Sequence, residues 1–454
     1  MNVVNAPFKF RGGVHPDGQK DLSRDKAIVA LPLPATLVVS MSQHLGAPAT
    51  CRVKPGDHVA AGQLIGERNG FISLGVHAPA AGVVKAVESR LGPSGAWAPA
   101  VVIQTDADPS ATPPVRLPPM DWRTASREDL LARLADAGIC GMGGAGFPTV
   151  VKLAPPPGRT CDVLILNGAE CEPYLTADFR VMVEQADRIR LGVEIMRKIL
   201  GGPAVRIAVE ANKPEAVAAL EAAFADIDGD VSIVVLPVLY PQGSEKHQIY
   251  AVTGRLVPPG ELPIAVGCVV ENVGTVAALA AAVADRQPLI ERVTTVSGDG
   301  IVEPRNILAP VGTRYADLVA FCGGEKPNVR KVISGGTMMG FAVPHLDVAT
   351  TKTTSGLLFL TDDRVFQYRA VPCINCGRCL RACPMRLNPA VISRAVEADD
   401  VPAARRAGVM NCIECGACAF VCPAYRSLTH LCRRAKNSIR AADVAAKAKA
   451  APQK

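Results

Sequence analysis

Aromatic residues and long apolar runs are both scarce in this sequence. Phe, Trp and Tyr make up 4% of its 454 residues, and no aromatic signature of an RNA-binding protein is present. A membrane-spanning helix needs about 20 consecutive apolar residues, but the most apolar stretch, Val276–Ala284, is short and ends at Asp285. The opening MNVVNAPFKFRGG has no apolar segment typical of a secretion signal. We therefore predict a soluble or peripheral protein that remains where it is made and binds no nucleic acid.

Charge of one sign is not in large excess either, since the formal net charge is +7. That excess is concentrated at the end of the chain, where residues 426–454 contain eight Lys and Arg and one acid, Asp443. We predict a basic tail over 434–454. Such a tail suits contact with anionic lipid or an acidic partner, and a solvated tail without a partner explains it equally well.

Cysteine is abundant, with 15 residues in a chain that shows no secretion signal. This combination favours metal sites over disulfides. Eight of the cysteines form two copies of the motif C-x₂-C-x₂-C-x₃-C, each followed by proline. They are Cys373, Cys376, Cys379 and Cys383 in the first copy and Cys412, Cys415, Cys418 and Cys422 in the second.

This spacing is typical of two [4Fe–4S] clusters, in which the fourth cysteine of each motif binds the cluster of the other motif. The crossed rule assigns Cys373, Cys376, Cys379 and Cys422 to cluster 1, and Cys412, Cys415, Cys418 and Cys383 to cluster 2. Zinc sites usually have paired cysteines with longer gaps. The 28 residues between the motifs include a helical pattern, which predicts a helical two-cluster ferredoxin-type domain over 366–433.

The other seven cysteines have no metal-binding spacing, and we expect most of them to be small core residues. They are Cys51, Cys140, Cys161, Cys171, Cys268, Cys322 and Cys432. A role for Cys432 stays open, because it lies close to the second motif in the sequence.

The length predicts two to four domains. Residues 1–105 alternate short apolar runs with Gly and Pro, which predicts a small β domain similar to the barrel-sandwich hybrid fold of lipoyl and biotinyl carriers. Its turn RNGF has no lysine to carry lipoate, so we interpret it as a docking module. A Pro-rich linker, 105–119, follows. Residues 120–272 alternate strands with helices, including a helix over Ser126–Ala137 capped by Ser126, and predict a largely parallel sheet. Residues 273–362 suit a β-grasp-like domain.

A glycine-rich loop, GICGMGGAGFPTVVKL, lies within the α/β region. Glycines allow a backbone to approach a phosphate and to present its N–H groups, and Lys152 would add positive charge. The loop precedes a strand instead of following one, so it is not a standard dinucleotide fingerprint. A purely structural turn explains the glycines equally well. The candidate residues of this loop are Gly141, Gly143, Gly144, Gly146, Phe147 and Lys152.

Polar residues also follow several strands of the α/β region, where ligands of parallel sheets bind. Each could instead be a solvent-facing loop residue, but together they predict one nucleotide pocket. They are Asn167, Glu170, Glu172 and Asp178 after the first strand, Gly243, Glu245 and Lys246 after the third, and Asn272 before a helix.

Together these motifs resemble the RnfC proteins, which belong to the Rnf complexes, the ion-translocating ferredoxin:NAD⁺ oxidoreductases. The resemblance covers nearly the whole chain. It includes FRGGVHP (Phe10–Pro16), SQHLGAPA (Ser42–Ala49), GMGGAGFPT, NGAECEPYLTAD, YPQGSEKHQIYAVTGR and both cysteine motifs. The central region also resembles the NADH- and FMN-binding subunit of respiratory complex I.

This resemblance implies a multidomain α/β plus β fold, with a barrel-sandwich-like N-terminal domain, an α/β flavin/NADH-binding domain, a β-grasp domain and a helical two-cluster ferredoxin domain. It implies that the glycine loop and Lys152 line the phosphates of FMN and NADH, with Phe147 in the same loop. It places Asn167, Gly243, Glu245 and Asn272 at the flavin and Glu170 near the nicotinamide. No residue is implied as a catalytic acid or base.

The sequence departs from the complex I pattern at Met142, Ala169, Ser244 and Glu271. The favoured hypothesis is a peripheral oxidoreductase subunit on the cytoplasmic face of the bacterial inner membrane. It would pass electrons between NAD(H), FMN and two [4Fe–4S] clusters, with other subunits of the complex, and ferredoxin through them, as partners. One alternative is an electron relay whose flavin site is vestigial, which the departures at Ala169, Ser244 and Glu271 motivate. A related cobalamin reductase is another, although FRGGVHP and SQHLGAPA favour the Rnf family.

Overall fold

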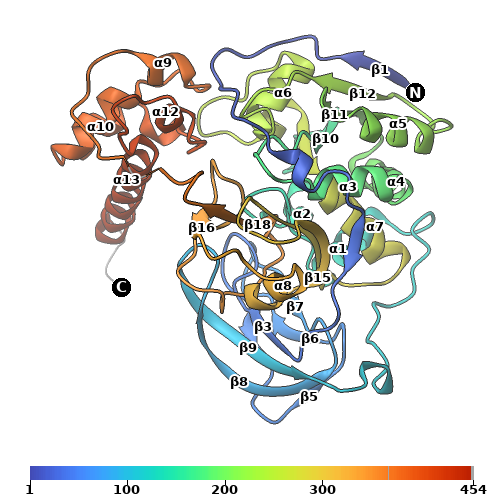
Figure 1. Ribbon diagram of the computed structural model, residues 1–454. Helices are drawn as coiled ribbons and strands as arrows, with labels where there is room; N and C mark the ends of the chain where they lie inside the picture. The colour runs from blue at the N-terminus through green and yellow to red at the C-terminus, as the bar shows by residue number, and fades with distance from the viewer. Residues whose placement is uncertain (367, 451–454) are drawn as a thin grey trace.

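The computed structural model describes residues 1–366 and 368–450, and side chains up to residue 446 (Figure 1). Four folded parts are visible: an α/β domain, a small β domain, a mixed β domain and a helical lobe at the C-terminal end. Within these ranges no helix is both long and apolar enough to cross a membrane.

The α/β domain is built on a sheet of five parallel strands, as the strand–helix alternation predicts. In spatial order the strands are β1 (Asn2–Asn5), β12 (Val231–Leu236), β11 (Ala204–Glu210), β10 (Val163–Gly168) and β13 (Cys268–Asn272). The edge strand β1 was not predicted in this sheet. All four of its residues are exposed, so it has no apolar alternation that would reveal it in the sequence.

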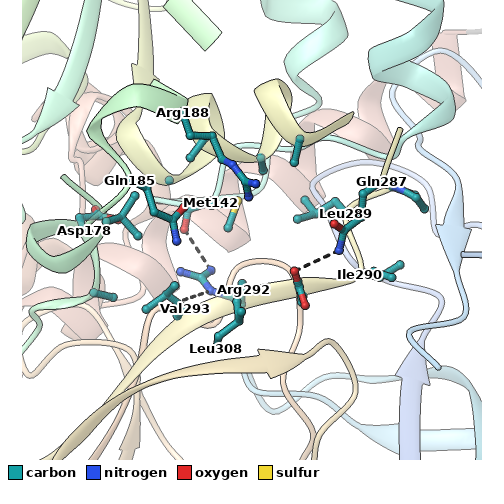
Figure 2. Close-up of a pocket in the computed structure, with 18 residues that line it drawn as sticks. Met142, Asp178, Gln185, Arg188, Gln287, Leu289, Ile290, Arg292, Val293 and Leu308 are labelled. Atoms are coloured by element: carbon teal, nitrogen blue, oxygen red, sulfur yellow. Dashed lines mark hydrogen bonds between the residues drawn. The ribbon is translucent and has the colours of Figure 1, made fainter. Parts of the chain in front are cut away.

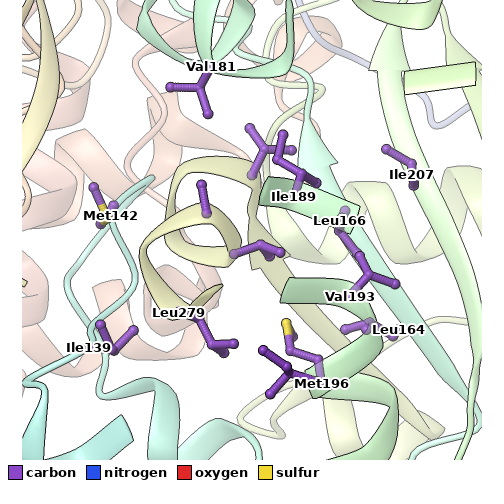
Figure 3. Packing of buried hydrophobic residues seen from close by; sticks show 14 of the residues in the cluster. Ile139, Met142, Leu164, Leu166, Val181, Ile189, Val193, Met196, Ile207 and Leu279 are labelled. Carbon is purple, nitrogen blue, oxygen red and sulfur yellow. The ribbon is translucent and has the colours of Figure 1, made fainter. Parts of the chain in front are cut away.

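Helices cover both faces of this sheet. Leu164 and Leu166 of β10 point into a core with the helices of one face, whereas Ile165 points into a smaller core under α6 (Glu245–Thr253) on the other (Figure 3). This alternation follows from the two-residue period of a strand. The helices of the first face are α1 (Arg127–Asp136), α3 (Ala177–Glu184), α4 (Ala186–Leu200), α5 (Pro214–Ala223) and α7 (Val273–Ala284).

Helix α1 confirms the predicted helix and its cap. The Ser126 side chain accepts a hydrogen bond from the Asp129 N–H, and the Asp129 side chain accepts one from the Ser126 N–H. The apolar pattern over 180–201 is typical of one long helix, but the chain leaves helical geometry at Gln185, where φ is −128°. Helices α3 and α4 therefore pack separately, and Gly201 ends α4 in a left-handed conformation.

The small β domain consists of two sheets that share one apolar core. One sheet contains β3 (Thr36–Ser40), β9 (Trp97–Thr105), β8 (Gly82–Leu91) and β5 (His58–Val59). The other contains β4 (Thr50–Cys51), β6 (Leu64–Glu67) and β7 (Val76–His77). Only residues 36–105 of the predicted N-terminal unit belong to this domain.

The mixed β domain is a six-stranded sheet with one helix, α8 (Tyr315–Phe321). Its order is β17 (Phe341–Ala342), β16 (Val329–Ser334), β18 (Gly356–Thr361), β14 (Glu291–Ser297), β15 (Arg305–Pro310) and β2 (Ile28–Ala30). The first 30 residues thus add one strand, β1, to the α/β sheet and another, β2, to this sheet. Residues 6–27, which we call the N-terminal strap, connect them.

The C-terminal lobe is helical and projects from one side of the molecule (Figure 1). Its elements are α9 (Arg378–Ala382), α10 (Pro389–Glu397), α11 (Val401–Arg406), α12 (Ala417–Phe420) and α13 (Leu428–Ala450). Residues 434–450 of the predicted basic tail belong to α13, and 451–454 lie outside the described residues. Short helical turns elsewhere are α2 (Thr149–Lys152) and the 3₁₀ turns Lys20–Leu22, Pro109–Ala111, Pro263–Val266 and Val409–Asn411.

Candidate functional site

The glycine loop is closed at its base and open at its tip. Cys140 and Pro148 form an isolated antiparallel bridge, and the Gly141 N–H donates to the Phe147 carbonyl over 2.9 Å. Among the described residues, no acceptor bonds to the N–H groups of Gly143, Gly144 or Gly146. Gly143 and Gly144 are exposed, so their N–H groups can accommodate an anionic group, whereas Gly146 is buried.

Asn272 fixes the loop against the end of strand β13. A Cβ atom on Gly143 would meet the Asn272 side-chain nitrogen at 2.7 Å, so this close approach requires glycine. Asn272 Oδ1 accepts from the N–H groups of Gly274 and Thr275 at 3.0 and 3.2 Å and thereby caps α7. Its Nδ2 donates to Asp178 Oδ2 over 2.7 Å. Burial, reinforced by nearby Glu170, raises the pKa of Asp178 to about 7.

Lys152 lies between two glutamates at the end of the sheet. Its Nζ is 3.0 Å from Glu245 Oε2 and 3.9 Å from Glu271 Oε1, and it donates to the Val270 carbonyl over 2.6 Å. Burial alone would lower the pKa of Lys152, but Glu271 and Glu245 together raise it. The lysine is therefore a cation whose charge two carboxylates already balance.

Glu271 is the least expected of these groups. It is 1% exposed, and neither carboxylate oxygen has a hydrogen-bond partner among the described residues. Burial raises its pKa above the ordinary value. A buried carboxylate with free oxygens can accept hydrogen bonds from a bound ligand, such as a ring N–H or a hydroxyl.

Asn167 and Gly243 meet where strand β10 ends. Asn167 Nδ2 donates to the Gly243 carbonyl over 2.9 Å, and Gln248 Nε2 donates to Asn167 Oδ1 over 2.7 Å. The Gly243 N–H in turn bonds to the Cys171 sulfur over 3.2 Å. The structure therefore brings most of the predicted nucleotide residues to one end of the sheet. They are the glycine loop, Asn272, Lys152, Glu245, Asn167 and Gly243.

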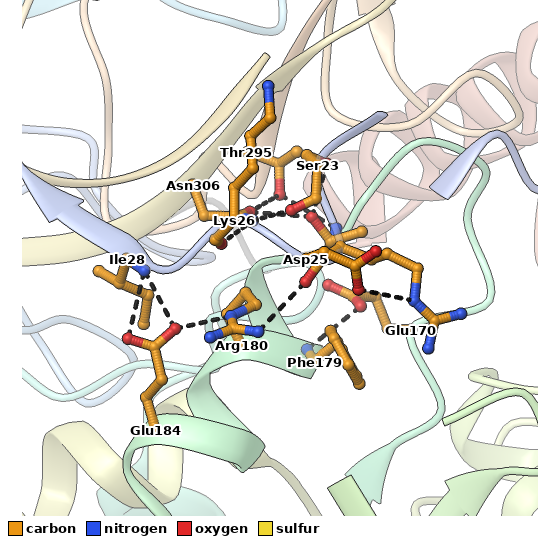
Figure 4. Close-up of polar contacts among 12 residues, drawn as sticks. Ser23, Asp25, Lys26, Ile28, Glu170, Phe179, Arg180, Glu184, Thr295 and Asn306 are labelled. Atoms are coloured by element: carbon orange, nitrogen blue, oxygen red, sulfur yellow. Dashed lines mark hydrogen bonds and ion pairs between the residues drawn. The ribbon is translucent and has the colours of Figure 1, made fainter. Parts of the chain in front are cut away.

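Glu170 has a structural role in this arrangement. Its two oxygens accept from the N–H groups of Asp178 and Phe179 at 2.7 and 3.2 Å, at the start of α3 (Figure 4). The Lys20 ammonium donates to the carbonyls of Glu170, Glu172 and Leu175 over 2.9, 2.9 and 2.6 Å. The sequence analysis missed Lys20, because no motif surrounds it and its partners are about 150 residues away.

The eight motif cysteines line two separate cavities in the C-terminal lobe. Cys373, Cys376, Cys379 and Cys422 line one, which we call cavity 1. Cys383, Cys412, Cys415 and Cys418 line the other, cavity 2, and Cys432 lines it as well. This is the partition that the crossed rule predicts. Within the described residues no set of three or more His, Cys, Asp and Glu side chains is placed to hold a single metal ion.

Cavity 2 lies against the α/β domain. The Tyr240 hydroxyl donates to the Cys415 carbonyl over 2.7 Å and lies 3.4 Å from Glu172 Oε1. Glu172 Oε2 accepts from the Met338 N–H over 3.0 Å, and burial raises the pKa of Glu172 to about 7. The loop that contains Glu172, the mixed β domain and the second cysteine motif therefore meet at one junction.

The N-terminal strap crosses the same junction. Val14 and Tyr240 exchange backbone hydrogen bonds of 2.8 and 2.9 Å, and the Gly13 N–H donates to the Ala382 carbonyl over 2.9 Å. Gly12 has a φ of +87°, and a Cβ atom there would meet the Cys383 carbonyl oxygen at 2.8 Å. The FRGGV segment thus packs directly on a cysteine that lines cavity 2.

A further cavity opens beside the glycine loop, between α3, α7 and β14 (Figure 2). Met142 and Asp178 belong to its lining, together with Arg188, Gln185 and Arg292. Arg292 donates to the Met142 and Lys352 carbonyls over 3.3 and 2.7 Å, and burial lowers its pKa to about 10. The predicted nucleotide residues Asn167, Lys152, Gly243 and Glu245 are not part of this lining.

Four family models match successive parts of the chain. The RnfC barrel sandwich hybrid domain matches residues 8–108, and the Nuo51 FMN-binding domain matches 134–281. An SLBB domain matches residues 293–342, and a 4Fe-4S dicluster domain matches 367–423.

Curated relatives match over most of their length. The C subunit of the proton-translocating ferredoxin:NAD(+) oxidoreductase complex of Clostridium ljungdahlii is 46% identical over 85% of this chain and 83% of its own. The C subunit of the Na(+)-translocating complex of Acetobacterium woodii is 42% identical over 86% and 87%. The C subunit of the ion-translocating oxidoreductase complex of Rhodobacter capsulatus is 39% identical over 89% and 78%. Among solved structures, an NAD+-reducing [NiFe]-hydrogenase matches with a TM-score of 0.48 at 18% identity, over 69% of this chain and 63% of that one.

Proposed function

This chain belongs to the RnfC family, the C subunits of ion-translocating ferredoxin:NAD⁺ oxidoreductase complexes, and we propose that it passes electrons between NAD(H), FMN and two [4Fe–4S] clusters in such a complex. The observation that carries the proposal is the direct contact between the flavin-binding domain and the second cysteine motif, through Tyr240 and Cys415. This contact would hold a two-electron site next to one-electron sites.

The end of the parallel sheet fits FMN. The N–H groups of Gly143 and Gly144 would hold the phosphate, because they lack other acceptors and lie in the exposed part of the loop. Gly146, which is buried, would line the same site from beneath. Asn167, Gly243, Glu245 and Asn272 would line the flavin, and Phe147 lies in the same loop. The carboxylates of Glu245 and Glu271 suit the N–H and hydroxyl donors of a flavin better than they suit its phosphate.

Lys152 would stand between these two regions. Glu245 and Glu271 already balance the charge of Lys152. Lys152 would therefore act on the ligand mainly through a directed hydrogen bond, and its net positive charge would contribute less. The placement of Gly141 at the base of the loop, and of Glu170 near the nicotinamide, stay predictions. NAD(H) would bind on the exposed side of the loop.

Bound FMN would supply the conversion between a two-electron hydride transfer and one-electron steps. The protein's own residues would bind and orient the reactants, and none is assigned as a catalytic acid or base. Cavity 2 is next to the α/β domain, so its cluster, held by Cys383, Cys412, Cys415 and Cys418, would exchange electrons with the flavin. The cluster in cavity 1, held by Cys373, Cys376, Cys379 and Cys422, would exchange them with the partner.

The partners that this role implies are other subunits of a membrane complex, with ferredoxin as the one-electron substrate of the whole assembly. We propose that the chain sits peripherally at the cytoplasmic face of the bacterial inner membrane. The basic side chains of α13, such as Arg434 and Arg440, are exposed and suit contact with anionic surfaces.

Anaerobic purification followed by iron, sulfide and flavin quantitation tests the proposal. We expect about eight irons and one FMN per chain, and loss of cluster absorbance on addition of NADH. Eight irons without flavin or NADH-dependent bleaching would reduce the chain to an electron relay with a vestigial flavin site. Corrinoid reduction by NADH would instead identify a cobalamin reductase.

A further inference from the structure

Cavity 1 lies under a surface that is unusually apolar for an exposed one. Ile374 and Leu380, each next to a motif cysteine, are 64% and 46% exposed, and Val371 is exposed as well. Cys376, a predicted ligand, is itself exposed. Tyr368 and Tyr425 stack with ring centroids 3.8 Å apart at the border of this area. Exposed apolar groups gathered at one redox centre are typical of a protein-binding surface.

The same surface carries positive charge that no carboxylate balances. Four exposed arginines lie beside it, and within the described residues none of them forms an ion pair. They are Arg369, Arg378, Arg381 and Arg394.

The acidic residues of the lobe are all occupied elsewhere. Glu397 pairs with Arg426, Asp399 pairs with Arg434, and Asp400 caps α11. Glu414 pairs with Arg433 and Lys436 beside cavity 2. The positive field over cavity 1 is therefore uncompensated, and it would attract an acidic surface.

An open groove leads from this surface to cavity 1. Val371, Pro372, Asn375 and Arg394 line it, together with the ion pair of Arg426 and Glu397, and Cys373 lines both the groove and the cavity. A partner seated in the groove would lie next to a cluster ligand. Cavity 2 offers no such route on the side of the α/β domain, because Tyr240 and the N-terminal strap cover it there.

We propose that the surface formed by Val371, Ile374 and Leu380, with its four arginines, is the docking site for an acidic electron-carrier protein that bears its own iron–sulfur cluster. This inference rests on the proposed function and adds the place where electrons enter or leave the chain. Electron-transfer contacts are small and transient, so a compact apolar centre with a charged rim is sufficient. The charge steers the encounter, and the apolar centre brings the two clusters close together.

Stopped-flow kinetics tests the docking site without NADH. The full chain, loaded with iron and sulfide, is mixed with an acidic two-[4Fe–4S] ferredoxin that dithionite has reduced. The test variant is R369E/R394E, because both arginines lie outside the cysteine motifs. The matched control is K54E/K85E, two exposed lysines of the small β domain that form no ion pair among the described residues. It changes the net charge by the same amount.

We expect R369E/R394E to lower the second-order rate at low salt by at least about 10-fold, with the difference shrinking as salt is raised. K54E/K85E should stay within about twofold of the unaltered protein. Equal rates in R369E/R394E and the unaltered chain, or equal losses in both variants, would overturn the proposal.

Two measurements keep this result separate from the proposed function. Iron content and the dithionite-reduced spectrum of each variant show whether its clusters are intact. Binding of oxidised ferredoxin by calorimetry requires no electron transfer, so it tests docking even if NADH fails to reduce the chain. Ferredoxin that binds R369E/R394E as tightly as the unaltered chain would refute the docking site.

Discussion

The two cysteine cavities have nearly identical motifs and very different surroundings. Cavity 1 borders solvent, with exposed Cys376 and Ile374 and unpaired arginines nearby. Cavity 2 is enclosed, because Cys415 is buried and bonded through its carbonyl to Tyr240, and Cys383 lies under Gly12. In the proposed electron path, the motifs would determine where iron binds, whereas the residues packed around them would determine which cluster faces the flavin and which faces a partner.

Helix α13 adds a second difference. Thr429, Cys432 and Lys436 recur at helical spacing and face cavity 2 together. Thr429 lies 3.9 Å from the Cys418 sulfur, and the Lys436 ammonium donates to the Cys412 carbonyl over 2.8 Å. Hydrogen bonds and positive charge near a cluster favour its reduced state. Cavity 2 receives this support from residues of one helix, α13, whereas the positive side chains that line cavity 1 are Arg394 and Arg426.

Removing one ligand cysteine from each cavity should have the largest effect and tests the difference between the two cavities most directly. We expect C415A to lose about four irons and to block NADH-dependent reduction of the remaining cluster. C376A should also lose about four irons, yet keep NADH-dependent reduction of the cluster in cavity 2 while losing electron transfer to ferredoxin. Iron analysis and low-temperature EPR after NADH addition separate the two. If C376A blocked the NADH reaction and C415A did not, the order of the clusters would be reversed.

The parts of this arrangement that the sequence predicts are those with local signals. Ser126 and Asp129 form a capping box three residues apart, and the strands of the parallel sheet are continuous apolar runs. The two cysteine motifs likewise have fixed spacing. Each of these patterns arises within about a dozen residues, so one sequence is enough to reveal it.

The N-terminal strap could not be predicted in the same way. Its contacts join Gly13 to Ala382 and Lys20 to Glu170, which are far apart in the sequence. The accepting groups are backbone carbonyls, which carry no sequence signature. Strand β1 is polar and exposed, so its pairing with β12 leaves no periodic pattern. Glu170 was expected at a ligand because it follows a strand, and only the structure shows its carboxylate capping α3.

A glycine substitution in the strap gives an intermediate effect. G12A would force a Cβ into the Cys383 carbonyl, whereas G56A has a similar φ of +96° and nothing within 4 Å. In both variants the new alanine must adopt a left-handed backbone conformation, which destabilises the fold by about 1–3 kcal/mol. Only G12A should also disturb the junction at cavity 2. We expect slower reduction of the clusters by NADH in G12A, with flavin reduction unchanged in both. Rapid-mixing absorbance spectroscopy measures both steps.

Equal behaviour of G12A and G56A in that experiment would show that the strap does not position cavity 2. A lower free energy of unfolding in G12A than in G56A, measured with urea, would add that the strap also stabilises the fold. Iron content must match in the two variants, because cluster loss would slow reduction for a different reason.

The smallest expected effect concerns Cys432, which borders cavity 2 without being a predicted ligand. It is 1% exposed, and its thiol is within hydrogen-bonding reach of Cys412. A thiol that donates to a ligand sulfur stabilises the reduced cluster. C432A should therefore lower the reduction potential of the cavity 2 cluster and leave that of cavity 1 unchanged, and C432S, which keeps a donor, should shift it less. EPR-monitored redox titration measures both potentials. The control is C322A, which removes a buried thiol from the mixed β domain. If C322A shifted the potential of the cavity 2 cluster as much as C432A does, the change in C432A would reflect a general loosening of the fold.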